Sequence, residues 1–222
     1  MDPALDLQTV YQNRFSENEK KRQVVWQVLT RDFFQQWVRP DDAVLDVGAG
    51  YCEFINNINA KTKYALDLNP TTASAAAAGV NVVSQDISEP WQLADASVNV
   101  VFSSNFLEHL NSKDAVLHCL REARRVLKPD GTVILLGPNI RFCSTAYWDF
   151  FDHHIPLSDR SIVEALQLSG FECTRVVDRF LPFTMQGNKP THPFLITAYL
   201  KMPFAWNIFG QQFLVIGKPA KV

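Results

Sequence analysis

The sequence lacks features that define several classes of protein. Only 4 of its 222 residues are cysteine, at positions 52, 119, 143 and 173, and this spacing fits neither a CxxC redox pair nor a zinc knuckle. No run of eighteen apolar residues occurs, although 193–216 is unusually apolar before Lys201 interrupts it, so we expect no membrane span. No apolar targeting segment follows the acidic start. These absences together predict a reducing, cytoplasmic setting.

The chain also lacks an excess of basic charge. Its 21 lysines and arginines are offset by 23 acids, which gives a net charge of −2. A chain with this balance has no overall positive electrostatic field to attract the phosphates of a nucleic acid, so we expect no nucleic-acid partner. The content of 47% hydrophobic and 20% charged residues is instead enough for a large core, which excludes disorder and coiled coil. We therefore expect one domain over 1–222.

From residue 43 onward, short β-rich runs alternate with helical stretches. The predicted strands are 43–47, 63–68, 80–84, 98–103 and 132–136, the helices between them are 52–60, 73–78 and 113–127, and a turn is predicted at 129–131. One long helix precedes them, because apolar residues recur every fourth position from Val25 to Trp37. A helix capped by Ser158 or Asp159 and two strands, 171–177 and 211–216, follow. Such alternation builds a parallel sheet flanked by helices.

A glycine loop follows the first predicted strand. The run Val44-Leu45-Asp46-Val47-Gly48-Ala49-Gly50 leads straight into a helix, which is the layout at which open α/β sheets bind nucleotides. Gly48 and Gly50 let the backbone approach a ligand closely, and the N–H groups that open the helix favour a negative group such as a carboxylate. The dinucleotide fingerprint requires a glycine at position 53, but Glu53 stands there and would repel a pyrophosphate. An NAD oxidoreductase is therefore disfavoured.

Acidic residues also close the next two strands. Asp67 ends the second strand, where its two oxygens can accept hydrogen bonds from both hydroxyls of a ribose. Asp86 follows the third strand and can accept from an adenine amino group, while the backbone of Ile87 reads the edge of the ring. Three acidic strand ends, at 46, 67 and 86, surround one diglycine loop and predict a ligand that carries a nucleoside.

These motifs resemble those of the class I S-adenosylmethionine-dependent methyltransferases, in particular the small-molecule group that includes the ubiquinone and menaquinone enzymes. Val44–Gly50 looks like the first motif, Asp67 like the ribose-binding acid, Asp86-Ile87 like the adenine segment, Ser103–Leu110 like the fourth-strand motif and Arg125–Thr132 like the turn before the fifth strand. The resemblance covers roughly 40–180 and 211–217. It implies an α/β fold with a three-layer, Rossmann-like sheet, mostly parallel with an antiparallel last strand, and S-adenosyl-L-methionine as cofactor.

The resemblance also implies which residues hold the cofactor. They are Asp46, Gly48, Gly50, Asp67, Leu68, Asp86, Ile87, Ser104 and Asn105. Residues 1–39 look like an N-terminal lid and helix, from which Tyr11 could reach the cofactor's carboxylate. Tyr51 and Cys52 occupy the place of the family's third glycine, so Cys52 could touch the cofactor.

Methyl transfer from a sulfonium is an in-line displacement in which positioning supplies most of the rate. Effective molarities of about 10⁵–10⁸ M compare with a factor of about 10²–10⁴ from a general base. A sugar hydroxyl needs a base, whereas a carboxylate or acidic phenol does not, and we favour oxygen over nitrogen or carbon as the acceptor atom. The candidate bases are His109, after the fourth strand, and His153 and His154, in the connection after the fifth. Each of them also fits a purely structural role.

We expect no metal site. Adjacent histidines such as His153 and His154 point in different directions, and their spacing from Asp149 and Asp152 is not distinctive of any metal ligand set.

Two stretches resemble substrate-side insertions. The connection 138–157 is rich in aromatic residues and is expected to select a small-molecule acceptor, either aromatic or lipid-linked. The stretch 181–210 is apolar and broken by prolines. It could roof the acceptor pocket, form a homodimer contact, make a peripheral membrane contact, or pack as ordinary core. The alternative function is a catalytically inactive, methyltransferase-like binding module that holds a partner through 181–210.

Overall fold

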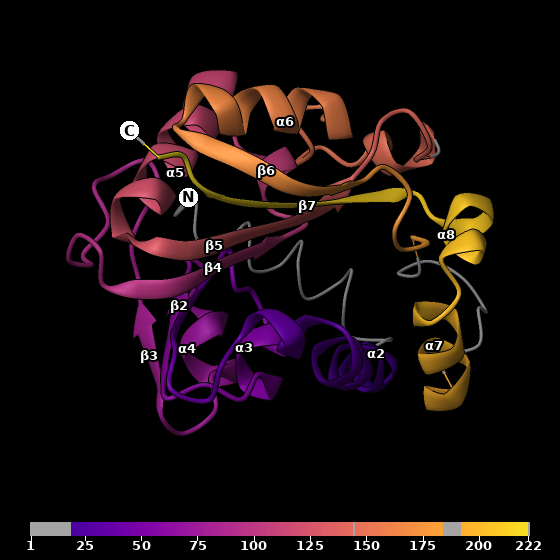
Figure 1. Cartoon of the computed structure of the whole chain (residues 1–222), viewed down its shortest axis with the longest axis horizontal. Helices are drawn as coiled ribbons and strands as arrows, with labels where there is room; N and C mark the ends of the chain where they lie inside the picture. The colour runs from indigo at the N-terminus through magenta and orange to yellow at the C-terminus, as the bar shows by residue number, and fades with distance from the viewer. Residues whose placement is uncertain (1–18, 144, 184–191, 222) are drawn as a thin grey trace.

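The computed structural model describes residues 19–143, 145–183 and 192–221, which form three layers around one sheet (Figure 1). The strands of the sheet are β1 (Ala43–Val47), β2 (Thr62–Leu66), β3 (Val80–Val83), β4 (Val98–Ser104), β5 (Leu127–Pro138), β6 (Phe171–Val177) and β7 (Gln212–Pro219). Helices α5 (Lys113–Val126) and α6 (Asp159–Leu168) cover one face, and α2 (Glu19–Asp32), α3 (Glu53–Asn57) and α4 (Thr71–Ala75) cover the other.

The strand order is β3-β2-β1-β4-β5-β7-β6. Strands β1 to β5 pair in parallel, and β7 runs antiparallel to both β5 and β6. This confirms the predicted fold, a mostly parallel sheet with an antiparallel last strand. The chain leaves β1 toward one edge of the sheet and returns at β4 to build the other, so a crevice opens between the carboxyl ends of these two strands.

Alternation along the strands explains why both faces are covered. In β1, Leu45 and Val47 belong to the core under α5 and α6, whereas Val44 points into the core on the α2 side. Strand β5 behaves in the same way, with Leu135 on the first face and Ile134 on the second. A strand that is apolar at successive positions must be buried on both sides, as parallel strands in α/β proteins are.

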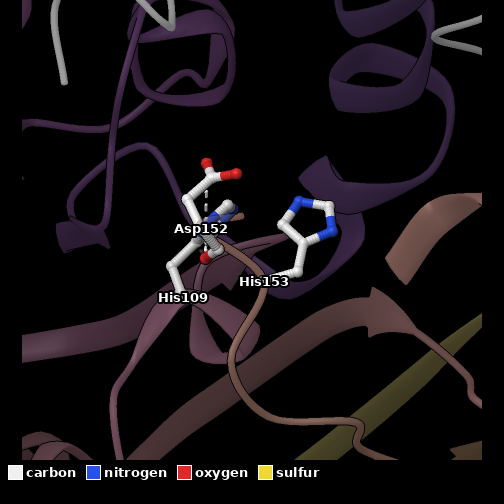
Figure 2. A group of neighbouring side chains, drawn as sticks. All are labelled: His109, Asp152 and His153. Carbon is white, nitrogen blue, oxygen red and sulfur yellow. Dashed lines mark hydrogen bonds and ion pairs between the residues drawn. The ribbon is translucent and has the colours of Figure 1, made fainter. Parts of the chain in front are cut away.

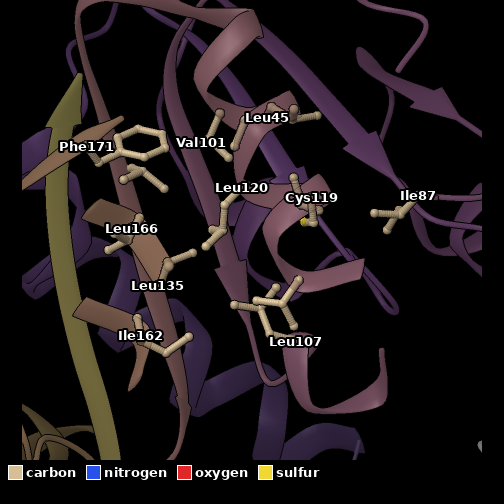
Figure 3. Packing of buried hydrophobic residues seen from close by; sticks show 14 of the residues in the cluster. Leu45, Ile87, Val101, Leu107, Cys119, Leu120, Leu135, Ile162, Leu166 and Phe171 are labelled. Atoms are coloured by element: carbon tan, nitrogen blue, oxygen red, sulfur yellow. The ribbon is translucent and has the colours of Figure 1, made fainter. Parts of the chain in front are cut away.

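The core under α5 and α6 is largely aliphatic, as Figure 3 shows. Leu120 of α5 and Ile162 of α6 are both buried in it, together with Leu135 of β5. Burial of these side chains removes apolar surface from water and holds the two helices against the sheet. This layer therefore fixes the strands from the side opposite α2.

The core on the α2 side is dominated by aromatic rings. Phe54 of α3 stacks on Phe102 of β4 with ring centroids 3.7 Å apart, and Phe34 meets Phe102 edge-on at 5.1 Å. Phe34 belongs to the short helix η2 (Phe34–Trp37). Because α3 follows directly on the glycine loop, this packing holds the loop at the end of β1.

The bounds of several predicted elements shift, as for the helix predicted at 73–78, which is α4 at Thr71–Ala75, and three differences are larger. The first helix ends at Asp32, because Phe33 adopts φ −130° and a 3-10 turn follows it. The predicted turn at 129–131 is part of β5, where a register shift between Val98 and Val100 accommodates the extra residues as a bulge. The stretch 181–210 contains two short helices, α7 (Pro193–Leu200) and α8 (Pro203–Phe209).

Those two helices lie at one end of the molecule (Figure 1). Leu200 and Trp206 are buried in the core on the α2 side, whereas Phe194, Phe204 and Phe209 are exposed. Over the part of the chain that the structure describes, no helix combines the length and the apolar character that a bilayer crossing requires.

The stacked pair under the glycine loop predicts a stability effect. Phe54→Ala should lower the free energy of unfolding by about 3–5 kcal/mol, because it removes a fully buried ring and leaves a cavity. Phe151→Ala is the matched control: its side chain is 98% exposed, so the change should stay within about 0.5 kcal/mol. Urea unfolding followed by circular dichroism measures both, and equal effects of the two substitutions would contradict the packing described.

Candidate active site

A cavity of about 500 Å³ opens at the carboxyl ends of the parallel strands. The glycine loop, the ends of β2 and β3, helix α2, the end of β4 and the connection after β5 all contribute to its wall. Tyr11 lies outside the described residues, and Cys52 does not line the cavity. The other residues that the sequence assigned to the site all line this one cavity: Asp46, Gly48, Gly50, Asp67, Leu68, Asp86, Ile87, Ser104, Asn105, His109, His153 and His154. The structure thus brings the predicted residues together, and their individual roles remain predictions.

The glycine loop depends on two residues with positive φ. Gly48 has φ +70° and Gly50 has φ +50°, a region that favours glycine. The N–H of Gly48 donates to the carbonyl of Leu66 at 2.9 Å, and a Cβ on Gly48 would overlap the ring of Phe106. Glycine is therefore required at position 48 by both conformation and space.

Cys52 stands where the family resemblance placed a third glycine. It adopts φ +59°, a conformation that costs a residue with a Cβ about 1–2 kcal/mol. Its side chain is fully buried, with Sγ 3.7 Å from the carbonyl oxygen of Thr72, and it does not line the cavity. Burial raises the pKa of its thiol to about 12. The expectation that Cys52 touches the cofactor is therefore wrong: the residue packs beneath the loop.

Asp67 ties the end of β2 to the glycine loop. Its Oδ2 accepts a hydrogen bond from the N–H of Gly50 at 2.7 Å, and its Oδ1 accepts one from the N–H of Asn69 at 2.8 Å. Burial raises the pKa of this carboxyl, and the backbone hydrogen bonds partly oppose the rise. A carboxylate offers about four lone-pair positions, so both oxygens can still accept from ligand hydroxyls.

Asp46 lies at the end of β1, and its side chain is almost fully buried. Burial, reinforced by the charges of Glu53 and Asp67, raises its pKa well above the usual range, while a backbone hydrogen bond from Ile55 opposes the rise. A negative charge at this buried position is unfavourable, and a positively charged ligand group would offset that cost.

Arg22 is a wall residue that the sequence reasoning missed. It lies on α2, forms an ion pair with Glu53, and its guanidinium lies over the ring of Tyr51 at 4.7 Å. Glu53 therefore does not face the cavity as an isolated negative charge. The available sequence signal was spacing: Arg22 and Trp26 are four residues apart, on one face of the helix, and both line the cavity.

The end of β3 supplies one side of the cavity. Asp86 accepts hydrogen bonds at Oδ1 from the N–H and the hydroxyl of Ser88, at 2.9 and 2.8 Å. Ile87 is buried and its carbonyl accepts the indole N–H of Trp91 at 3.2 Å. These contacts hold the segment after β3 in place at the edge of the cavity.

At the end of β4, Asn105 adopts φ +49° and its amide nitrogen donates to the hydroxyl of Ser104 at 3.0 Å. Among the described residues, the buried side-chain oxygen of Asn105 has no hydrogen-bond partner. Because both residues line the cavity, this oxygen is an acceptor suited to a donor group of a ligand.

The other end of the cavity is organised around Glu108, whose side chain is buried in the short helix η3 (Leu107–His109). Its Oε1 accepts the hydroxyl of Tyr147 at 2.5 Å, and its carbonyl accepts the N–H groups of His154 and Ile155 at 2.8 and 3.1 Å. Burial raises the pKa of the carboxyl. Glu108 was not singled out from the sequence, and through these contacts it anchors the connection 138–157.

That anchor brings three histidines to the cavity. Nδ1 of His109 lies 2.8 Å from the carbonyl oxygen of Asp152 and 3.3 Å from its Oδ2. Nδ1 of His153 lies 2.6 Å from the carbonyl oxygen of Tyr147, whose ring stacks on the imidazole at 4.2 Å. The rings of His109 and His153 meet edge-on at 4.8 Å. His154 also lines the cavity wall.

The environment of His109 acts on its charge in opposite directions. Burial lowers the pKa of the imidazole, but the hydrogen bond with Asp152 and the charges of Glu108 and Asp152 together outweigh burial, so the pKa is raised above its ordinary value.

Comparison with known proteins agrees with this geometry. Residues 45–135 match the family described as a methyltransferase domain. Among solved structures, a chain from the complex of the Haloferax volcanii Trm112 methyltransferase activator with a methyltransferase superposes with a TM-score of 0.68, at 16% identity, over 100% of this chain and 99% of that chain. A SAM-dependent methyltransferase from Archaeoglobus fulgidus gives 0.66 at 21% identity, over 92% and 98%. A SAM-dependent methyltransferase from Thermotoga maritima gives 0.65 at 17% identity, over 93% and 97%. No curated protein sequence matches the chain.

These findings define the class of the protein. Its fold is that of the class I methyltransferases, and residues 45–135, which include the glycine loop and the ends of β2, β3 and β4, form a methyltransferase domain. The chain is a methyltransferase whose cofactor is S-adenosylmethionine.

The buried carboxyl of Asp46 predicts that one substitution raises the stability of the protein and weakens its binding of the cofactor. Because its pKa is raised on folding, the charged form costs stability at pH 8, and this cost shrinks as the pH falls through the raised pKa. Asp46→Asn should therefore be more stable than the parent protein at pH 8, with a smaller difference at pH 5, and should bind S-adenosylhomocysteine about tenfold more weakly. Thermal unfolding at the two pH values and calorimetry measure these effects. Asp114→Asn, on the exposed start of α5, is the control, and an Asp46→Asn variant less stable than the parent at pH 8 would contradict the account.

Proposed function

We propose that this enzyme transfers the methyl group of S-adenosylmethionine to an oxygen atom of a small-molecule acceptor. One observation carries the proposal: a single cavity joins the glycine loop and Asp67 at one end to the three histidines at the other. A donor held at the first end would present its sulfonium toward the second, where an acceptor could approach in line.

The described residues fit the cofactor in its three parts. Asp67 would accept from the ribose hydroxyls, and Asp86 with Ile87 would flank the adenine, as the resemblance implies. Arg22 and the loop at Gly48 to Gly50 would hold the carboxylate of the methionine part.

The ammonium group of the methionine part needs acceptors on its own side of the cavity. The side-chain oxygen of Asn105 and the carboxylate of Asp46, whose charge is unfavourable when buried, both suit the ammonium group. Each of them would gain a partner when the ammonium binds. When bound, S-adenosylmethionine supplies an electrophilic methyl group.

The acceptor end favours a flat, apolar molecule with one polar group. The rings of Phe106, Tyr147, Phe150 and Phe183 line the cavity beside the histidines. The connection 138–157 supplies two of these rings and the stretch 181–210 supplies Phe183, which supports their proposed role as substrate-side insertions. An aromatic acceptor fits these walls best.

The histidines would remove the acceptor's proton. His109 and His153 are oriented by Asp152 and by Tyr147, so each ring has a fixed tautomer, which a general base requires. His154 is the third candidate, also in the cavity wall.

A peripheral membrane contact or a homodimer through 181–210 remains a proposal for the exposed apolar side chains of α7 and α8. The alternative of an inactive binding module is not favoured, because the glycine loop, Asp67 and the cavity are all intact.

The cofactor assignment predicts the effect of one substitution. Asp67→Asn should weaken S-adenosylhomocysteine binding about ten- to a hundredfold, because a hydrogen bond to a charged group contributes about 1.5–3 kcal/mol. Calorimetry measures the dissociation constant. Asp130→Asn, an exposed acid outside the cavity, should leave it unchanged, and undiminished affinity in the Asp67→Asn variant would overturn the assignment.

The acceptor assignment predicts a separation of binding from turnover. A panel of phenols, carboxylic acids and amines, assayed by methyl transfer from labelled S-adenosylmethionine, should yield products methylated at oxygen. With the acceptor so identified, His153→Gln should lower kcat by about 10²–10⁴-fold while cofactor affinity stays within about twofold. Exclusive methylation of the amines would contradict oxygen as the target, and an unchanged kcat would remove His153 from the reaction.

A further inference from the structure

We propose that His109, Asp152 and His153 bind a divalent transition-metal ion at the acceptor end of the cavity. One ligand atom from each of these residues lies within 4.8 Å of the others, and all three residues line the cavity. Figure 2 shows the three side chains together, with His109 arriving from η3 and the other two from the connection after β5. Two imidazoles and one carboxylate form a donor set that zinc, iron(II) and related ions accept.

The hydrogen bonds of the two rings orient them as ligands. Nδ1 of His109 faces the carbonyl oxygen of Asp152 and Nδ1 of His153 faces the carbonyl oxygen of Tyr147, at 2.8 and 2.6 Å. A carbonyl oxygen can only accept, so Nδ1 is the donor in each ring and Nε2 is the nitrogen that would ligate an ion. Histidines that bind metals usually donate their second ring nitrogen to a carbonyl or carboxylate in this way.

The spacing requires only a small contraction. Ligand atoms about 2.1 Å from a zinc ion at tetrahedral angles lie roughly 3.4 Å apart. The observed upper separation is 4.8 Å, so binding an ion would require the three side chains to draw together, while the backbone contacts of Glu108 to His154 and Ile155 hold the two segments in place.

The charge around the group also suits a cation. The acids that act on it are Asp152, as a ligand, Glu108, which is bound to the hydroxyl of Tyr147, and Asp67, whose charge interacts with His109. Among the described residues that line the cavity, Arg22 is the one arginine or lysine, and it is paired with Glu53 beside the glycine loop. A metal ion would therefore meet attraction from carboxyl groups rather than repulsion from neighbouring cations.

The sequence predicts no metal site because the spacing of the possible ligands within 149–154 alone is not distinctive. The third ligand is His109, 43 residues before Asp152, and only the fold brings the two together. His154, which the doublet suggested, does not belong to the group.

The role of the ion rests on the proposed function. An acceptor hydroxyl coordinated to a divalent ion has a lowered pKa and loses its proton to water near neutral pH. With the ion bound, His109 and His153 would therefore act as ligands in place of the role of general base. The resulting oxygen would attack the methyl carbon as the carbon–sulfur bond breaks, with the electron pair of that bond passing to sulfur. The products are a methyl ether or ester, S-adenosylhomocysteine and one released proton.

Calorimetric titration of Zn²⁺ into the full chain, previously stripped with a chelator and dialysed, tests the site. We expect one saturable site per chain. His109→Gln, Asp152→Asn and His153→Gln should each weaken it at least about a hundredfold, since even partners behind a ligand contribute about 10–100-fold to affinity. His154→Gln is the matched control, one residue from a ligand and in the same cavity wall, and should change the Zn²⁺ affinity by less than about threefold, because it removes no ligand. Binding of S-adenosylhomocysteine by each variant reports whether it is folded.

The outcomes separate the two proposals. If the stripped protein shows no saturable Zn²⁺ site, or if the three ligand variants bind as tightly as the parent, the metal site is overturned even though S-adenosylhomocysteine still binds. If His154→Gln weakens Zn²⁺ as much as His153→Gln, the assigned ligand set is wrong. If Zn²⁺ binds at the site and no acceptor is methylated at oxygen, the proposed function fails and the metal site stands.

Discussion

The hydrogen bond from the N–H of Gly50 to the carboxylate of Asp67, 2.7 Å long, is the interaction on which the site depends. It joins the loop after β1 to the residue after β2. The register of the two parallel strands, which pairs Val47 with Leu66, brings their ends level, and the N–H of Gly48 donates to Leu66 as well. The loop can follow this path only because Gly48 and Gly50 adopt positive φ. The path of this loop, which we propose holds the methionine part of the cofactor, is therefore set by the sheet itself.

A second anchor places the other end of the cavity. Glu108 holds the connection after β5 through the hydroxyl of Tyr147 and through backbone bonds to His154 and Ile155. A buried carboxyl whose oxygen and backbone are both engaged fixes its neighbours strongly, because breaking such a network leaves polar groups unsatisfied away from water. In the function proposed above, the glycine loop would hold the donor, the anchored connection would hold the acceptor, and the two would meet in the cavity between them.

Much of this could be predicted from the sequence because it is encoded locally. Successive apolar residues in strands such as Val44–Val47 specify burial on both faces, and the loop Gly48-Ala49-Gly50 after such a strand specifies a ligand at its carboxyl end. Asp67 and Asp86 could be assigned to the same site because the carboxyl ends of parallel strands meet at one edge of the sheet. The N-cap of α6 at Ser158 could also be predicted, and the structure shows the Ser158 side chain accepting a hydrogen bond from the N–H of Ser161.

The remaining features could not be predicted because they depend on contacts between distant segments. Arg22 reaches the cavity only because α2 packs against α3. His109 meets Asp152 and His153 only because Glu108 anchors a connection far downstream in the chain. The position of Cys52 indicates a loop residue near the ligand, yet its positive φ turns its side chain into the core. A turn signal at 129–131 became a bulge because pairing with β4 resumes on either side of it.

The most direct test of the central claim is a crystal structure of the chain with S-adenosylhomocysteine bound. The account predicts the ribose on the carboxylate of Asp67, the amino-acid part over Gly48 and Gly50 beside Arg22, and the sulfur directed toward His109 and His153. A ligand bound in another part of the molecule, or in this cavity with its sulfur directed away from the histidines, would contradict it.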